Sequence, residues 1–128
     1  MHEMALAQGI LDIALDYAAQ EKAARVSTVG LKIGAMSGVE TEALEMSFRL
    51  ISVGTVAEGA ELKITRIPLV GKCHKCGREL PIEAYNFWCP VCDNGVLKII
   101  SGREMQVDYL EIDDASGQQR EENSTNGV

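Results

Sequence analysis

Apolar side chains recur at helical spacing in two stretches of the chain. Over residues 4–20 they fall every three or four positions, and neighbouring ones widen the same stripe: Leu6, Ile10, Ile13 and Tyr17, with Met4, Leu11, Ala14 and Ala18. This period predicts an amphipathic helix with one buried face. A second helix is expected after residues 37–40, which have the pattern of a capping box, and its buried face holds Leu44, Phe48 and Ile51.

Three further segments alternate apolar and polar residues, which is the period of a half-buried strand. Residues 26–34, 60–67 and 103–112 place these side chains on their inner faces: Val29, Leu31 and Ile33; Leu62 and Ile64; Met105, Val107 and Tyr109. The chain after residue 112 is rich in polar residues and holds no large apolar side chain before Val128. Residues 113–128 are therefore expected to form a disordered tail.

The predicted order of elements is helix, strand, helix, strand, insert, strand. An α/β fold, with two helices packed on one face of a three-stranded sheet, buries the apolar faces most economically. The insert is similar to a zinc ribbon and lies between the second and third strands. We expect an α/β domain of residues 1–69 plus 102–112, and a metal-binding domain of residues 70–101. The insert has too few apolar residues to fold without its metal.

The chain has 128 residues, a net charge of −7 and 46% apolar residues, enough for one core. The acidic charge counts against nucleic-acid binding, because nucleic-acid readers show a basic face. No apolar run approaches the ~20 residues that span a bilayer, and no secretion signal is found, so we expect a cytoplasmic protein without membrane contact. A phosphate-binding glycine loop and a Ser/His/Asp layout are missing, so we do not expect an enzyme.

All four cysteines lie in two CxxC knuckles separated by twelve residues: Cys73, Cys76, Cys89 and Cys92. This spacing is typical of a site where four thiolates hold one tetrahedral ion. Two disulfides are the less favoured alternative in a cytosolic chain. Zinc is favoured over iron, which would make a rubredoxin-like electron carrier, and zinc in four thiolates is closed and structural. His74 lies inside the first knuckle, and a histidine at such a position is more often a solvated loop residue than a metal ligand.

Met1, His2 and Glu3 offer a second kind of metal site. The N-terminal amine, the amide nitrogen of residue 2 and the imidazole of His2 can chelate one ion through a five-membered and a six-membered ring. Three coplanar nitrogens suit Ni(II) or Cu(II), and Glu3 could add a carboxylate or its own amide nitrogen. The amide must lose its proton, so the affinity should rise with pH. Taken alone, a histidine at position 2 is most often an exposed terminal residue.

The Met1-His2-Glu3 start before an amphipathic helix, together with the cysteine quartet, resembles the HypA/HybF family of hydrogenase nickel-incorporation proteins. The likeness covers residues 1–112. It implies a nickel metallochaperone that helps to load [NiFe]-hydrogenase, with the GTPase HypB and the hydrogenase large subunit as partners, and with urease accessory proteins in some organisms. By matching position, it implies that His2 is the essential nickel ligand, helped by the Met1 amine and the Glu3 backbone. The four cysteines would hold structural zinc.

An alternative function stays open at this point. A zinc-ribbon module that binds a protein or a nucleic acid would use the same four cysteines, and His2 would then be incidental. Nickel binding that depends on His2 separates the two functions.

Overall fold

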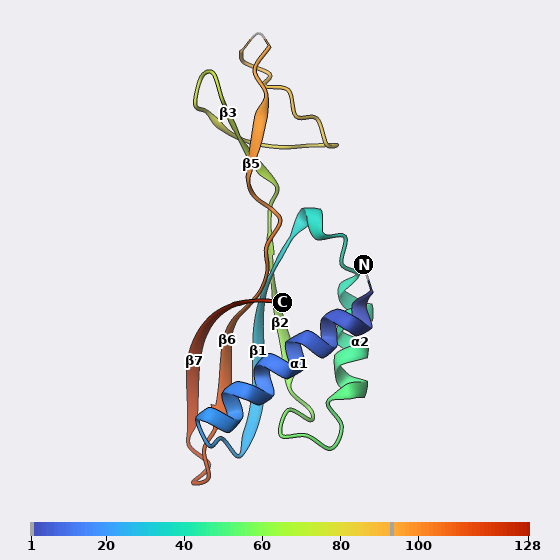
Figure 1. Cartoon of the computed structure of the whole chain (residues 1–128), viewed down its shortest axis with the longest axis vertical. Coiled ribbons are helices and arrows are strands. Elements are labelled where there is room, and N and C mark those ends of the chain that lie inside the picture. The colour runs from blue at the N-terminus through green and yellow to red at the C-terminus, as the bar shows by residue number, and fades with distance from the viewer. Residues whose placement is uncertain (1, 93) are drawn as a thin grey trace.

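The computed structural model describes residues 2–92 and 94–128. It is elongated, with an α/β layer at one end and a small ribbon at the other (Figure 1). The elements are α1 (Glu3–Gln20), β1 (Arg25–Gly34), the 3-10 helix η1 (Ala35–Ser37), α2 (Thr41–Ile51), β2 (Glu61–Ile67), β3 (Val70–Cys73), β4 (Glu79–Pro81), β5 (Leu97–Ser101), β6 (Met105–Asp113) and β7 (Gln119–Gly127). Among the described residues, no helix is long and apolar enough to cross a bilayer.

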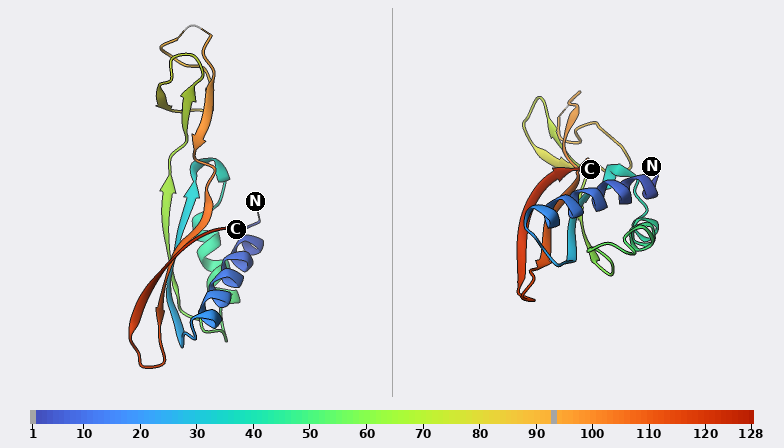
Figure 2. Two further views of the ribbon diagram at one scale, coloured as in Figure 1. Left: turned by 60° about the vertical axis from the view of Figure 1, so that its left-hand side comes forward. Right: turned by 60° about the horizontal axis from the view of Figure 1, so that its bottom comes forward.

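Both helices cover one face of the larger sheet, whose strand order is β2-β1-β6-β7 (Figure 2). β1 lies in its interior, parallel to β2 and antiparallel to β6. The helical stripes and the inner faces of β1 and β6 meet in one core, with Leu62 and Ile64 of β2 partly buried against it: Leu6, Ala7, Ile10, Leu11, Ala14, Ala18, Val26, Val29, Leu31, Ile33, Val39, Leu44, Phe48, Ala57, Val107, Leu110 and Ile112. The predicted α/β class is confirmed.

The sheet has four strands rather than the predicted three, because part of the expected tail is ordered. β7 pairs antiparallel along β6. The preceding turn is fixed by the carboxylate of Asp114, which accepts bonds from the N–H groups of Ser116 and Gln118 at 3.0 and 2.9 Å, while Gly117 adopts a φ of 83°. The prediction of a disordered tail is wrong for residues 119–127. Backbone hydrogen bonds to a free sheet edge hold this polar segment without an apolar stripe.

A bulge in β6 changes which of its side chains face the core. Gly30 of β1 pairs with Tyr109, but the next β1 residue pairs with Val107, so Asp108 is an extra residue in β6. Val107 and Leu110 are therefore buried, while the Tyr109 ring lies on the open face, against Gly30. The predicted inward position of Tyr109 is wrong, because the alternation changes phase at the bulge.

The α/β layer joins the ribbon through a tightly packed neck. Gly34 lies so close to the backbone of Gly102 that a side chain on Gly34 would overlap it. The Met36 N–H donates to the Gly102 carbonyl at 2.8 Å, and the Ser101 hydroxyl donates to the Pro68 carbonyl at 2.9 Å. Both chain segments that lead into the ribbon are thereby fixed against β1 and η1.

Candidate metal centre

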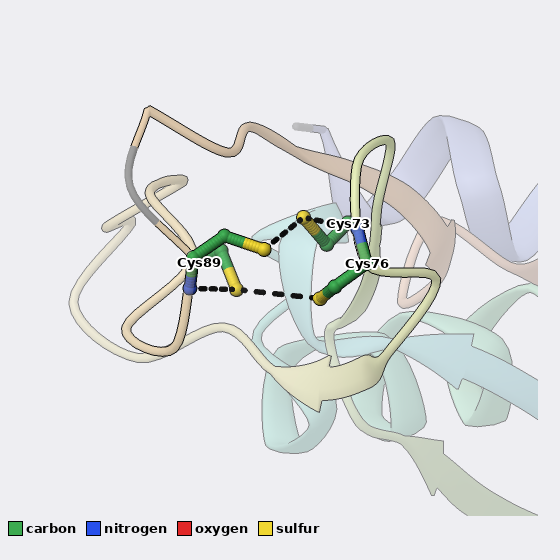
Figure 3. Close-up of side chains that lie close together, drawn as sticks. Cys73, Cys76 and Cys89 are labelled. Carbon is green, nitrogen blue, oxygen red and sulfur yellow. Dashed lines mark hydrogen bonds between the residues drawn. The ribbon is translucent and has the colours of Figure 1, made fainter.

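The two knuckles meet at the far end of the ribbon, where β3 leads into the first knuckle and β5 follows the second. The sulfur atoms of all four cysteines lie within 4.8 Å of one another. Cys73 and Cys89 are buried, and Cys76 and Cys92 close the group from the surface. Figure 3 shows side chains from the two knuckles pointing toward one another across the ribbon. The predicted group of four thiols is therefore brought together by the fold.

The spacing of the sulfurs fits zinc. Cys73 Sγ and Cys92 Sγ are 3.6 Å apart, and Cys76 Sγ and Cys89 Sγ are 3.9 Å apart. A tetrahedron with Zn–S bonds of ~2.3 Å has sulfurs about 3.8 Å apart, whereas a disulfide requires ~2.05 Å. All four cysteines are free thiols in the structure. The ligand set is thus matched to a closed, structural zinc ion, which would cross-link the two knuckles.

Backbone N–H groups of each knuckle point at a cysteine sulfur. The Sγ of Cys73 accepts from the N–H groups of Lys75 at 3.4 Å and Cys76 at 3.5 Å, and Cys92 N–H donates to Cys89 Sγ at 3.4 Å. The Cys76 N–H, with that of Lys75, lowers the pKa of Cys73 to about 6, since it favours the thiolate. The Cys76 sulfur, burial and the Cys73 sulfur raise the pKa of Cys92 to about 12. Four thiolates this close repel one another, so their joint ionisation requires a cation.

Gly95 allows the second knuckle to close over the sulfurs. A Cβ at this position would lie 2.7 Å from Cys73 Sγ and 3.0 Å from the Cβ of Cys89. Glycines beside metal-binding knuckles commonly adopt a positive φ in the turn. Gly77 in the first knuckle does so, with a φ of 75°, but Gly95 in the second does not have a positive φ. The need for glycine at position 95 is therefore one of close approach rather than of backbone conformation.

Gly95→Ala is expected to weaken zinc retention by at least tenfold, because the new methyl group must displace a cysteine sulfur or the backbone that carries it. Competition for zinc with a colorimetric chelator measures the effect. Gly77→Ala is the matched control, since it strains a left-handed residue but meets no atom within 4 Å. Equal zinc affinity in the Gly95→Ala variant and the unaltered chain would contradict the packing argument.

His74 is held by the backbone of the ribbon. The ring Nδ1 of His74 accepts a hydrogen bond from the Val96 N–H at 3.1 Å. The backbone N–H of His74 donates to the Val96 carbonyl at 3.3 Å. The ring is exposed, and among the described residues the only group of three or more possible metal ligands is the four cysteines. These contacts agree with the prediction of a loop histidine.

The residues that the sequence predicts as nickel ligands lie at the start of α1. His2 is exposed and is the N-cap residue of α1, with extended backbone and no side-chain capping bond. Its carbonyl accepts from the Leu6 N–H at 3.1 Å. Met1 lies outside the described residues. The imidazole of His2 is therefore at the surface and is not used by the helix.

Glu3 joins the starts of the two helices. Its carboxylate accepts a hydrogen bond from the Glu40 N–H at 3.3 Å, and this bond holds the pKa of Glu3 below its usual value. Glu40 is the N-cap of α2 and accepts from Glu42 N–H at 3.4 Å, so the predicted capping box at Ser37 is wrong. Ser37 instead ends η1. Sequence patterns missed this contact, because Glu3 and Glu40 are brought together only by the packing of α1 on α2.

A short path of contacts leads from the ribbon to this site. Gly102, at the base of the ribbon, binds Met36 of η1. The chain continues through buried Val39 to Glu40, whose N–H reaches Glu3 next to His2. The ribbon and the N-terminus are thus connected through one segment of six residues, 35–40.

Known proteins resemble this chain over most of its length. The sequence profile of the HypA family, described as "Hydrogenase/urease nickel incorporation, metallochaperone, hypA", matches residues 1–112. The hydrogenase maturation factor HypA of Dechloromonas aromatica is 39% identical over 113 residues, which cover 88% of this chain and 100% of that protein. The protein of the same name from Aquifex aeolicus is 42% identical over 113 residues, covering 88% of this chain and 98% of the relative.

Two solved structures share the fold. The solution structure of the Ni metallochaperone HypA from Helicobacter pylori covers 88% of this chain and 97% of its own, with a TM-score of 0.63 and 22% identity. A second solution structure of a HypA protein covers 88% and 96%, with a TM-score of 0.68 and 22% identity. Residues 113–128 lie beyond the range matched by the family profile. With a profile match over 112 of its residues and relatives at about 40% identity, the chain belongs to the HypA family of hydrogenase/urease nickel-incorporation metallochaperones.

Proposed function

We propose that this protein binds Ni(II) at its N-terminus, through His2, and delivers it during the maturation of [NiFe]-hydrogenase. Membership of a nickel-incorporation family supports the class of function. The observation that carries the assignment to the N-terminus is the exposed imidazole of His2 at the start of α1, free of any capping bond. A transferable ion needs such an open site, which a partner's ligands can reach.

The Met1 amine, the His2 amide nitrogen and the His2 imidazole supply three nitrogens in one plane, which Ni(II) favours. The fourth position falls to Glu3, through its amide nitrogen or its carboxylate. The carboxylate already accepts a bond from Glu40, so its use as a ligand would release the start of α2. The Glu3 amide nitrogen is therefore the better fourth ligand, since the contact between the helices then stays intact.

The cysteine quartet is a closed site, in contrast to the open site at His2. Four thiolates fill every position of a tetrahedral zinc ion, and two of the cysteines are buried. An ion held in this way exchanges slowly and orders the loops around it. We therefore assign the quartet to structural zinc and not to the cargo.

The partners in this proposal are those that the family resemblance implies. They are the hydrogenase large subunit, which would receive the nickel, and the GTPase HypB, which would supply energy for the step. Both are cytoplasmic in this proposal. The rival function, a zinc-ribbon docking module with no nickel role, gains no support from a family match that extends over the N-terminal residues as well as the ribbon.

A maturation assay tests delivery. Cells that lack their own HypA and carry a [NiFe]-hydrogenase should recover most hydrogenase activity with the unaltered gene and less than about a tenth of it with His2→Ala. Gln8→Ala, another exposed α1 side chain, is the matched control. Excess nickel salt should rescue the His2→Ala cells, because only the supply of nickel is defective. Full activity with His2→Ala at low nickel would rule the proposal out.

A further inference from the structure

Residues 114–128 form a strap that follows the edge strand β6 and ends beside the first turns of α1. After the turn at Asp114, β7 runs along the whole free edge of β6. The ladder ends where the Val128 N–H donates to the carbonyl of Met105, the first residue of β6, at 3.0 Å, and the Val128 side chain reaches α1 at Gly9. The family profile stops at residue 112, so the strap is an addition to the family fold.

The end of the strap forms one wall of an apolar hollow beside His2. The hollow is lined by α1, the start of β6 and the strap: His2, Ala5, Leu6, Gly9, Met105 and Val128. The Val128 side chain lies over Gly9, and a Cβ on that glycine would be 3.0 Å from Val128 Cγ1. Any large side chain on this turn of α1 would push Val128 away. Gly9, which costs helix stability, thus makes room for the strap at the proposed nickel site.

The strap is attached weakly. Arg120 links it to the end of α1: the Arg120 guanidinium lies 3.8 Å from the carboxylate of the C-cap residue Glu21 and donates to the Glu21 carbonyl at 3.3 Å. Glu121 lies directly opposite Glu111 in the β6–β7 register, and like charges at opposed positions destabilise a strand pair. Residues 119–122 bury no apolar side chain. Backbone bonds and exposed polar contacts hold this strand, with little apolar burial, so it opens more easily than the core strands.

We propose that the strap is a reversible cover that occupies in cis the surface on which a nickel-accepting protein docks beside His2. This inference rests on the proposed nickel role of His2. When the strap is docked, Val128 forms one wall of the hollow next to the imidazole and β7 covers the β6 edge. When it opens, both become available together, because one segment covers them. The docked strap therefore limits nickel transfer to large acceptors without taking part in nickel binding.

The expected size of the effect follows from the docked fraction. If the strap is docked roughly five times in six, opening it completely speeds transfer about sixfold. Small chelators approach His2 from the solvent side and should be affected much less than large acceptors.

Three variants of the full chain test the cover in both directions. Val128→Asp should undock the strap and speed nickel transfer to EDTA coupled to a soluble dextran about sixfold. Glu121→Lys should attract Glu111, tighten the strap and slow transfer roughly threefold. Glu61→Lys, an exposed position on β2 at the other edge of the sheet, makes the same charge change and should leave the rate unaltered.

Amide hydrogen exchange of β6 and β7, measured on the same samples, reports the strap directly and should rank the variants in the same order. If all variants bind one nickel and transfer it at equal rates, the strap does not act as a cover, and the proposed function stays intact. A slowing by Glu61→Lys equal to that by Glu121→Lys would also overturn it, because net charge would then be the cause. An absence of nickel binding by the unaltered chain overturns the proposed function itself, and the exchange data still show whether the strap is docked.

Discussion

Removing zinc, or replacing Cys89 by serine, is expected to unfold residues 70–101 and leave the α/β layer folded. The ribbon buries only five residues in its own cluster, and two of them are cysteines. Structural zinc contributes roughly 10–16 kcal/mol in small zinc domains, far more than so small a cluster can supply. The α/β layer has its own larger core and does not need the ion.

Amide hydrogen exchange measures this prediction. Amides of β3 and β5 should lose protection after zinc removal, while those of β1 should keep it. Val91→Ser is the matched control, because Val91 is an exposed residue of the same knuckle and not a ligand. Persistent protection of β3 and β5 without metal would show that the ribbon folds on its own. The nickel affinity of the Cys89→Ser variant also tests whether segment 35–40 couples the two metal sites.

Acetylation of the N-terminal amine is expected to weaken nickel binding by roughly 100-fold or more, since loss of a ligand should exceed the 10–100-fold cost of losing a supporting group. The acetyl group removes one nitrogen and with it the five-membered chelate ring. Nickel affinity of the free-amine chain should also rise with pH, because the participating amide must lose its proton.

Isothermal titration of nickel into acetylated and unacetylated protein, from pH 6 to pH 8, compares the two. The zinc content should be identical in both samples, because the quartet is distant in sequence and closed. An unchanged nickel affinity after acetylation would remove the amine from the site and shift the assignment to His2 with side-chain ligands such as Glu3.

Periodicity predicted the helices and the first two strands because each buries one face. α1 spans Glu3–Gln20, where residues 4–20 were predicted, and β1 keeps Leu31 and Ile33 in the core. The cysteine site could be predicted equally well from the sequence, since the CxxC spacing itself constrains where the sulfurs can meet. These features depend on local pattern and need no knowledge of the tertiary structure.

Other features depend on contacts that the sequence does not display. β7 has no apolar alternation, so only the free edge of β6 explains its order. The bulge at Asp108 places Tyr109 on the open face, and no residue type in the sequence indicates that a bulge occurs there. Glu3 reaches Glu40 only because the two helices pack together. Gly95 resembles an ordinary turn residue until the sulfur 2.7 Å from its missing side chain is seen.

The central claim is that the transferable metal sits at His2 and the fixed one at the cysteines. Nickel titration of the untagged, zinc-loaded chain and of its His2→Ala variant, with metal analysis of both, tests it most directly. The account predicts one zinc in each protein, one tightly bound nickel in the unaltered chain and none in the variant. Tight nickel binding that survives His2→Ala, or nickel that displaces zinc from the quartet, would contradict it.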